Sequence, residues 1–148
     1  MRAKIIPDVV HDQALAIMAP GLTVHGAAEV MAARNIGAVI VADNGRLVGI
    51  CTEGDIVTKV VAAGRDAKLV TIGEAMTPRP LTVSPDETPI AALMLMRKTG
   101  ILHLPVVDGE RIVGIVSVRD LNIEIQHELE DDLKLRDEFI SGGYSAQT

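Results

Sequence analysis

Two segments of this chain show the same succession of apolar and polar positions, which predicts the same elements twice. In each segment, apolar side chains first recur three and four residues apart, the period of a helix that buries one face. Two apolar runs joined by a glycine-containing turn follow, a pattern typical of a β-hairpin, and a second helix then begins. The predicted ranges are 23–35, 38–42, 47–51 and 56–61 in the first segment, and 88–100, 102–107, 112–116 and 121 onward in the second.

The residues at the predicted helix ends suit those positions. Thr23 and Thr88 can each cap a helix, because the hydroxyl accepts a hydrogen bond from a free backbone N–H, and Pro89 fits a first helical turn. Asn35 and Gly100 are residue types that tolerate the left-handed backbone with which many helices end. The first helix of each segment should therefore be well delimited.

The stretch between the two segments, residues 64–80, predicts turns rather than a helix. It contains Gly73 and two prolines, Pro78 and Pro80, which interrupt regular structure. A short extended piece is expected before each helix–hairpin–helix unit, at 16–18 and at 81–83. Each unit is therefore predicted to have the order β-α-β-β-α.

The two segments are copies of one unit. With positions 49 and 114 superimposed, an offset of 65 residues, they align without a gap. Half of a 148-residue chain is too small to bury its own apolar faces, so the repeats must pack on each other. We expect an α/β (α+β) fold with pseudo-twofold symmetry. The predicted parts are a first repeat at 8–64, a linker at 65–76, a second repeat at 77–123, and an acidic C-terminal helix and tail at 124–148.

The C-terminal segment predicts an amphipathic helix with an acidic outer face. From position 124 on, the chain carries seven acidic residues and two basic ones, a net charge of −5. A helix this exposed is not stable alone, so we expect it to cover the body or a second subunit. Its apolar positions recur four residues apart, at Leu121, Ile125, Leu129 and Leu133.

Charge and hydropathy argue against several kinds of partner. The whole chain has a net charge of −6, so residues 1–123 have a net charge of −1. They contain no stripe of basic residues of the kind that binds nucleic acid. No apolar run approaches the roughly 20 residues that span a bilayer, and the first residues lack the pattern of a signal peptide. We expect a cytoplasmic protein with no membrane or nucleic-acid partner.

The sequence offers no set of residues suited to catalysis. The four histidines and Cys51 show no metal-ligand spacing, so no metal site is expected. Cys51 aligns with Val116, which indicates a buried small hydrophobic side chain. The methionines at 31, 94 and 96 fall at helical spacing and are expected in the core. No nucleophile with an adjacent base can be assembled, so we expect neither an enzyme nor a catalytic cofactor.

Both repeats end in the pattern Gly–hydrophobic–hydrophobic–(Ser/Thr)–x–x–Asp, at Gly49–Asp55 and at Gly114–Asp120. Together with the segments at 75–78, 83–88 and 103–108, these motifs resemble those of tandem cystathionine-β-synthase (CBS) domains, over roughly residues 8–123. The resemblance implies a free-standing pair of β-α-β-β-α units that commonly dimerises into a flat disc. It also implies clefts between the repeats that bind adenosine-containing ligands.

By this resemblance, Asp55 and Asp120 would hold ribose hydroxyls, and Thr52 and Ser117 would lie near the phosphates. The chemistry of the residues agrees, because a carboxylate can accept both hydrogens of a cis-diol and a helix N-terminus attracts phosphate. The same Ser/Thr-x-x-Asp pattern is also an ordinary helix cap. Either interpretation predicts that a helix begins at each motif.

The two motifs differ beside the aspartate, where Arg119 in the second corresponds to Gly54 in the first. Arg119 could pair with a phosphate, reach a neighbouring site in a dimer, or remain solvated. Arg79 is a second phosphate candidate. His103 could border the pocket or be a packed, hydrogen-bonded core residue. By the family's pattern, the second pocket should also draw on Thr77, Arg79, Leu81, Leu102 and His103.

Two functions follow from these observations. The first is a regulatory module, expected to be a homodimer, whose clefts bind AMP, ADP, ATP or another adenosyl compound such as S-adenosylmethionine or NADH. It would pass the occupancy of the clefts to a regulated protein that the sequence does not identify. The alternative is a structural or protein-interaction module that binds no ligand and uses its dimer surface and the acidic C-terminal helix.

Overall fold

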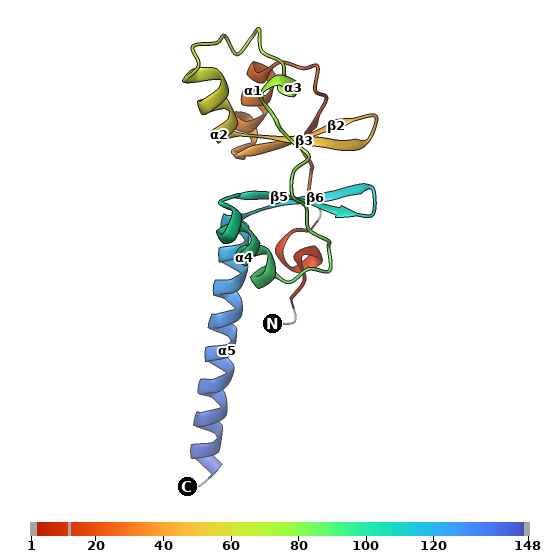
Figure 1. Ribbon diagram of the computed structural model, residues 1–148. Helices are drawn as coiled ribbons and strands as arrows, with labels where there is room; N and C mark the ends of the chain where they lie inside the picture. The colour runs from red at the N-terminus through yellow and green to blue at the C-terminus, as the bar shows by residue number, and fades with distance from the viewer. Residues whose placement is uncertain (1–2, 12, 147–148) are drawn as a thin grey trace.

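The computed structural model describes residues 3–11 and 13–146, with side chains up to residue 140. Two halves are stacked so that their β-sheets face each other and their helices lie on the outside (Figure 1). Each half corresponds to one repeat of the sequence, which confirms the predicted doubled α/β architecture. The long C-terminal helix leaves the second repeat and points away from the first (Figure 1).

The elements of the first repeat and the linker are β1 (Ile17–Met18), α1 (Val24–Arg34), β2 (Ala38–Asp43), β3 (Arg46–Thr52), α2 (Glu53–Ile56), η2 (Val57–Val61), α3 (Ile72–Ala75) and β4 (Thr77–Pro78). Here η2 is a wide helical turn that continues α2. The second repeat contains α4 (Pro89–Thr99), β5 (His103–Asp108), β6 (Arg111–Ser117) and α5 (Val118–Ala146), and the N-terminal turn η1 (Ile5–Val9) packs against it.

The first sheet has the strand order β1-β2-β3-β4, with β1 parallel to β2 and the other neighbours antiparallel. The second sheet consists of β5 and β6, and Val83 forms an isolated parallel bridge to Val106, where β1 would be expected by symmetry. Both hairpins shift register at the same place, after Val41 and after Val106. The repeat in the sequence is thus preserved down to an irregularity in the strands.

The predicted caps of the first helices are confirmed. The hydroxyl of Thr23 accepts a hydrogen bond from a backbone N–H at 3.1 Å, and that of Thr88 accepts one at 3.2 Å. Asn35 (φ 52°) and Gly100 (φ 75°) adopt the left-handed conformation at the other ends. Local sequence therefore sets both ends of α1 and α4.

The prediction of turns without a helix at 64–80 is wrong over residues 72–75, which form α3. The helix begins with a reciprocal cap: Glu74 N–H donates to the Thr71 hydroxyl at 3.2 Å, and Thr71 N–H donates to the Glu74 carboxylate at 3.1 Å. Ile72 and Ala75 are fully buried on one face. Capping and burial outweigh the low helix propensity of Gly73.

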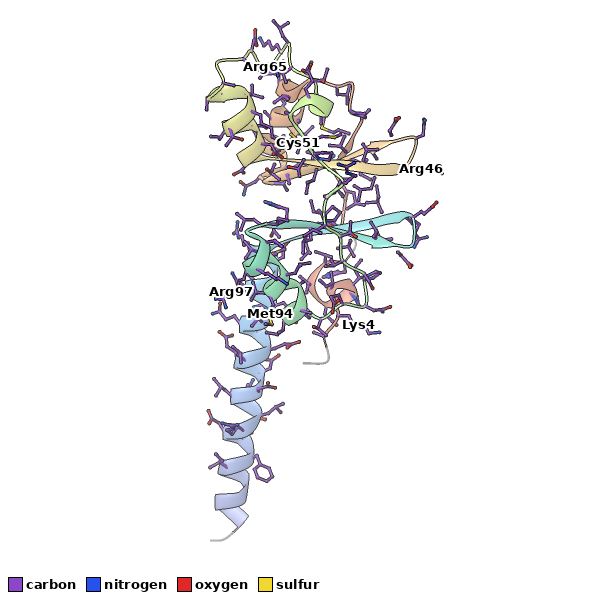
Figure 2. All side chains as sticks on the ribbon, viewed as in Figure 1. Lys4, Arg46, Cys51, Arg65, Met94 and Arg97 are labelled. Atoms are coloured by element: carbon purple, nitrogen blue, oxygen red, sulfur yellow. The ribbon has the colours of Figure 1, made fainter. Side chains whose placement is uncertain are left out.

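Aliphatic and sulfur-containing side chains form the cores. In the second repeat, Ile5 and Val10 from the N-terminal segment join Met96, Leu104 and Leu121. The first repeat has a matching cluster that includes Met31 and Cys51, as predicted. Met94 was predicted to be buried and is instead 65% exposed, because it lies on the outer side of α4 (Figure 2).

Gly49 lies where β3 pairs with β4. A Cβ atom added there would lie within 3.0 Å of the Thr77 carbonyl oxygen and would collide with the Met76 side chain. At the equivalent Gly114 the nearest atoms are 3.4–3.6 Å away, an ordinary contact distance. The two glycines are thus equivalent in sequence but not in packing.

Gly49→Ala is therefore expected to lower the free energy of unfolding by about 1–3 kcal/mol, the usual cost of overpacking. Urea denaturation of both alanine variants measures this, with Gly114→Ala as the matched control. An equal loss in the two variants would contradict the packing difference.

The C-terminal helix α5 was predicted to cover the body or a second subunit, and among the described residues only its first part covers the body. Its first turns pack against α4 and η1, and the outer part projects from the molecule (Figure 1). Within the described residues, no helix is both long enough and apolar enough to cross a membrane.

Candidate functional site

Two pockets open between the repeats, one beside each motif. The first has a volume of about 440 Å³ and is lined by residues of the motif from Thr52 to Gly54, by the start of the second repeat from Thr77 to Leu81, and by the segment from Gly100 to His103. The second has a volume of about 600 Å³ and is lined by the motif from Ser117 to Asp120, by Gln13, Ala14 and Ala16, and by the segment from Asn35 to Ala38. Each pocket thus combines both repeats.

The segment that leads into each repeat lines the pocket beside the motif of the other repeat. The prediction that Thr77, Arg79 and Leu81 complete the second pocket is wrong, because they line the first pocket, together with the motif of the first repeat. The cause is the pairing of β4 with β3, which places Thr77 beside Ile50, close to the first motif. Leu102 and His103 line both pockets.

In the second pocket, the motif forms a helix cap that leaves part of the aspartate available. Asp120 Oδ2 accepts a hydrogen bond from Ser117 N–H at 3.0 Å, and the Ser117 hydroxyl accepts one from Asp120 N–H at 3.1 Å. Among the described residues, Asp120 Oδ1 has no hydrogen-bond donor, and the side chain is half-buried in the wall. One carboxylate oxygen can therefore accept hydrogen bonds from a ligand, at the N-terminus of the 29-residue helix α5.

Gln13 holds the N-terminal segment at the rim of this pocket. Its side-chain amide donates to the Ile115 carbonyl at 3.1 Å and accepts from Ile115 N–H at 3.0 Å. These two bonds replace the backbone pairing that β4 makes with β3 at the equivalent edge of the first repeat. A side chain thus completes the edge of the second sheet.

In the first pocket, the motif aspartate is fully engaged by the protein. Asp55 Oδ2 accepts hydrogen bonds from the Thr52 N–H at 3.0 Å and from the Thr52 hydroxyl at 3.1 Å. Its Oδ1 accepts from the Thr77 hydroxyl at 3.0 Å and lies 3.2 Å from Lys59 Nζ. The residue is 8% exposed and is absent from the pocket wall. The two motif aspartates, both of which the resemblance assigned to ribose hydroxyls, therefore differ.

Lys59 ties this network to the linker. Besides pairing with Asp55, its ammonium donates to the carbonyls of Ala75 at 3.0 Å and Met76 at 3.1 Å, at the end of α3. The first motif is thus fastened to the segment that leaves its repeat. Its carboxylate is a structural acceptor in this arrangement.

The two pockets share one wall, formed by Gly37, Glu53, Leu102 and His103. Gly37 leaves the space for it, since an added Cβ would lie 3.1 Å from His103 Nε2 and 3.2 Å from the Glu53 carboxylate. Burial lowers the pKa of His103, against the opposing effect of Glu53 and Asp120. The imidazole is therefore mainly neutral at pH 7 and can donate and accept hydrogen bonds in the wall.

The two arginines proposed as phosphate ligands lie at different pockets. Arg119 is exposed and lines the second pocket beside Asp120. Arg79 lines the first, where its backbone has a φ of 47° and its N–H donates to the Val48 carbonyl at 3.2 Å. The second pocket thus has an arginine beside Asp120 in the sequence, whose carboxylate is available, and the first has Arg79 in a lining that also contains Glu53.

Cys51 is buried inside the first repeat, as predicted (Figure 2). Burial, with a contribution from Asp55, raises the pKa of its thiol to about 11. The thiol is therefore protonated and unreactive at neutral pH. Among the described side chains, no group of three or more His, Cys, Asp or Glu could hold a metal ion.

Sequence reasoning missed several residues of the second pocket: Gln13, Asn35, Gly37 and Glu53. The internal repeat contained the signal for three of them. With the offset of 65 residues, Gln13, Asn35 and Gly37 align with Pro78, Gly100 and Leu102. The first pocket is lined by the segment that leads into the second repeat. By the symmetry of the repeats, the second pocket is then expected to be lined by the N-terminal segment that leads into the first repeat. Glu53 corresponds to Val118, so the repeat in the sequence does not indicate that Glu53 lies in the shared wall.

Comparison with known proteins supports the relation suggested by the motifs. The family model described as CBS domain matches residues 8–62 and 72–127. A mitochondrial CBS domain-containing protein of Arabidopsis thaliana, CBSX3, is 34% identical over 127 residues, which are 82% of this chain and 62% of that protein. The protein YhcV of Bacillus subtilis, also a CBS domain-containing protein, is 34% identical over 109 residues, 74% of this chain and 77% of its own.

A solved structure similar to this chain contains adenosyl compounds. It is the CBS domain pair of protein MJ0100, in complex with 5′-methylthioadenosine and S-adenosyl-L-methionine. The match has a TM-score of 0.74 at 28% identity and covers 85% of this chain and 99% of that one. The likeness therefore extends over both repeats.

Proposed function

Because the chain belongs to the CBS-domain family and carries two such domains, we propose that it is a regulatory module whose second pocket binds an adenosine-containing small molecule. CBS pairs are regulatory modules that often bind adenosine ligands, as the MJ0100 pair does. AMP, ADP and ATP are the first ligands to test, followed by S-adenosylmethionine and NADH. We expect no catalytic activity.

The available oxygen of Asp120 is the observation that carries this proposal. A ribose presents two adjacent hydroxyl groups, and a carboxylate oxygen with no protein donor is a suitable acceptor for them. The N-terminus of α5 lies beside it, and Arg119 lines the same pocket, so both can favour a phosphate. The volume of this pocket lies within the range of about 300–1,000 Å³ usual for small-molecule sites.

Adenine would lie against aliphatic side chains. Ala16, Ile36, Ile115 and Ile123 line the second pocket, and the described part of both repeats contains no aromatic residue. His103 and the Gln13 amide supply polar groups at the edges of this apolar surface. Hydrogen bonds to the base and packing on its faces are thus both available.

Ligand binding could be signalled to a partner because the walls of the second pocket come from different parts of the chain. The second pocket contains residues of the N-terminal segment, the first repeat and the second repeat. A ligand that binds one relative arrangement of these parts more tightly than another shifts the population towards that arrangement. A regulated protein, whose identity is open, would detect that shift.

We propose one nucleotide per chain. The Asp55 carboxylate of the first motif is engaged by Thr52, Thr77 and Lys59, so a ribose there would have to displace protein donors. Gly54 also replaces the arginine of the second motif. Both differences favour the second pocket as the ligand site.

Calorimetric titration of ligand-free protein with AMP, ADP, ATP, S-adenosylmethionine and NADH tests the proposal. We expect saturable binding of at least one compound with a stoichiometry near one per chain. An absence of heat with all five, confirmed by an unchanged melting temperature at millimolar ligand, would refute the sensor function. It would favour the alternative of an interaction module, for which the exposed outer part of α5 is the specific observation.

A further inference from the structure

The first motif carries an acidic side chain where the second has an apolar one. Glu53 in the first motif corresponds to Val118 in the second. Together with Asp55, it gives the first motif two acidic residues and no basic one, whereas the second motif has one of each, Asp120 and Arg119. The two repeats therefore present different charges at equivalent places.

The Glu53 carboxylate is not used by the helix cap beside it. The cap of α2 is formed by Thr52 and Asp55, and Glu53 contributes only its backbone N–H, which donates to the Gly37 carbonyl at 3.0 Å. Within residues 3–11 and 13–140, the carboxylate has neither a hydrogen-bond donor nor an ion-pair partner, and the residue is exposed. Its charge is thus free to act on a molecule that enters the pocket.

Glu53 lies in the wall that the two pockets share. A Cβ atom added at Gly37 would lie 3.2 Å from Glu53 Oε1 and 3.1 Å from His103 Nε2, so both side chains lie against this glycine. Burial lowers the pKa of His103, so the imidazole is mainly neutral at pH 7 and does not cancel the negative charge. A ligand in either pocket therefore meets the Glu53 carboxylate.

The other charged groups of the pockets do not compensate for a highly charged anion. Among the described residues, the second pocket has Glu53, Asp120 and Arg119, two acidic groups and one basic, a net charge of −1. The first has Glu53 and Arg79, a net charge of zero. Each phosphate group of a nucleotide adds negative charge, and a polyphosphate chain is usually bound by a surplus of basic groups. Neither pocket provides such a surplus.

We propose that Glu53 is a specificity-determining residue that disfavours polyphosphates, so that the chain binds adenosyl compounds with one phosphate or with a positive charge in preference to ATP. A single phosphate is still matched by Arg119 and the N-terminus of α5. A sulfonium or ammonium group is attracted by the Glu53 carboxylate. This inference rests on the proposed binding of an adenosine-containing ligand, but Glu53 lines both pockets, so it does not depend on which pocket is occupied.

Calorimetric titration of the Glu53→Gln variant tests this role, at low salt and without divalent cations, which would mask the charge of ATP. Glutamine keeps the size of the side chain and removes its charge. The substitution should tighten the binding of ATP about three- to tenfold and weaken that of S-adenosylmethionine by a similar factor. The wild-type chain should bind AMP more tightly than ATP. Damage to the structure would weaken all ligands, so opposite shifts identify an effect of charge.

The matched control is Glu110→Gln, which removes the same charge at the exposed β5–β6 turn, outside both pockets. It should leave all dissociation constants unchanged. Wild-type protein that binds ATP as tightly as AMP, or equal shifts in the two glutamine variants, would overturn the role of Glu53 and leave adenosine binding intact. Binding of none of these compounds to the wild type would overturn both proposals, so the two failures can be distinguished.

Discussion

Replacing Asp120 with asparagine is expected to weaken adenine-nucleotide binding by about 10- to 100-fold while the fold is retained. The asparagine side-chain oxygen can still accept the hydrogen bond from Ser117 N–H, so the helix cap survives. The position of the available oxygen is then taken by an amide NH₂ group, which cannot accept a ribose hydroxyl. The range corresponds to the loss of about 1.5–3 kcal/mol for a hydrogen bond to a charged group.

Calorimetric titration of the variant measures this loss, and the circular dichroism melting curve reports the fold. Asp131→Asn, which makes the same chemical change at an exposed position of α5, is the matched control and should bind like the wild type. Unchanged affinity in Asp120→Asn together with weakened binding in Asp55→Asn would move the nucleotide to the first pocket. That result would overturn the assignment of the available oxygen as the ribose acceptor.

Replacing Asp55 with alanine is expected to destabilise the protein by about 2–3 kcal/mol, with little direct effect on the second pocket. The substitution removes the buried carboxylate that accepts hydrogen bonds from Thr52 and Thr77 and pairs with Lys59, whose exposed ammonium keeps its two carbonyl partners. A domain near this size loses about 2–4 °C of melting temperature per kcal/mol, so the expected decrease is roughly 4–12 °C.

Urea denaturation gives the free energy of unfolding for this variant. The matched comparison is Asp120→Ala, where the cap hydrogen bond from Ser117 N–H to the half-buried carboxylate is lost, the bond from Asp120 N–H to the Ser117 hydroxyl is kept, and about 1 kcal/mol is expected. Equal losses in the two variants would show that the Asp55 network contributes no more than an ordinary helix cap. The proposed difference between the motifs would then have no energetic basis.

Local patterns in the sequence predicted most of the fold. The spacing of apolar residues located α1, α4 and both hairpins, and the capping threonines and the left-handed Asn35 and Gly100 delimited the helices. These features depend on neighbours within a few residues, which a single sequence displays. The short α3 was missed because Gly73 and the nearby prolines conceal a Thr71–Glu74 cap.

The site was harder to predict because its geometry depends on distant pairings. All ten predicted site residues except Asp55 line a pocket, but the division of these residues between the pockets was wrong. Nothing in the local sequence shows that Thr77 pairs with the edge of β3. The Asp55 carboxylate likewise has all its partners only when Thr77, 22 residues away, donates to it and Lys59 on the next turn pairs with it. Whether these residues bind a ligand stays a prediction.

The crossing of the lead-in segments has a consequence for how the two repeats can diverge. Each cavity is lined by the motif of one repeat and by further residues of the other. Neither half of the chain, produced separately, would contain a complete binding site. A substitution in the shared wall, at Glu53 or His103, alters both cavities at once. The duplicated halves are therefore not independent modules, and specialisation of one cavity constrains the other.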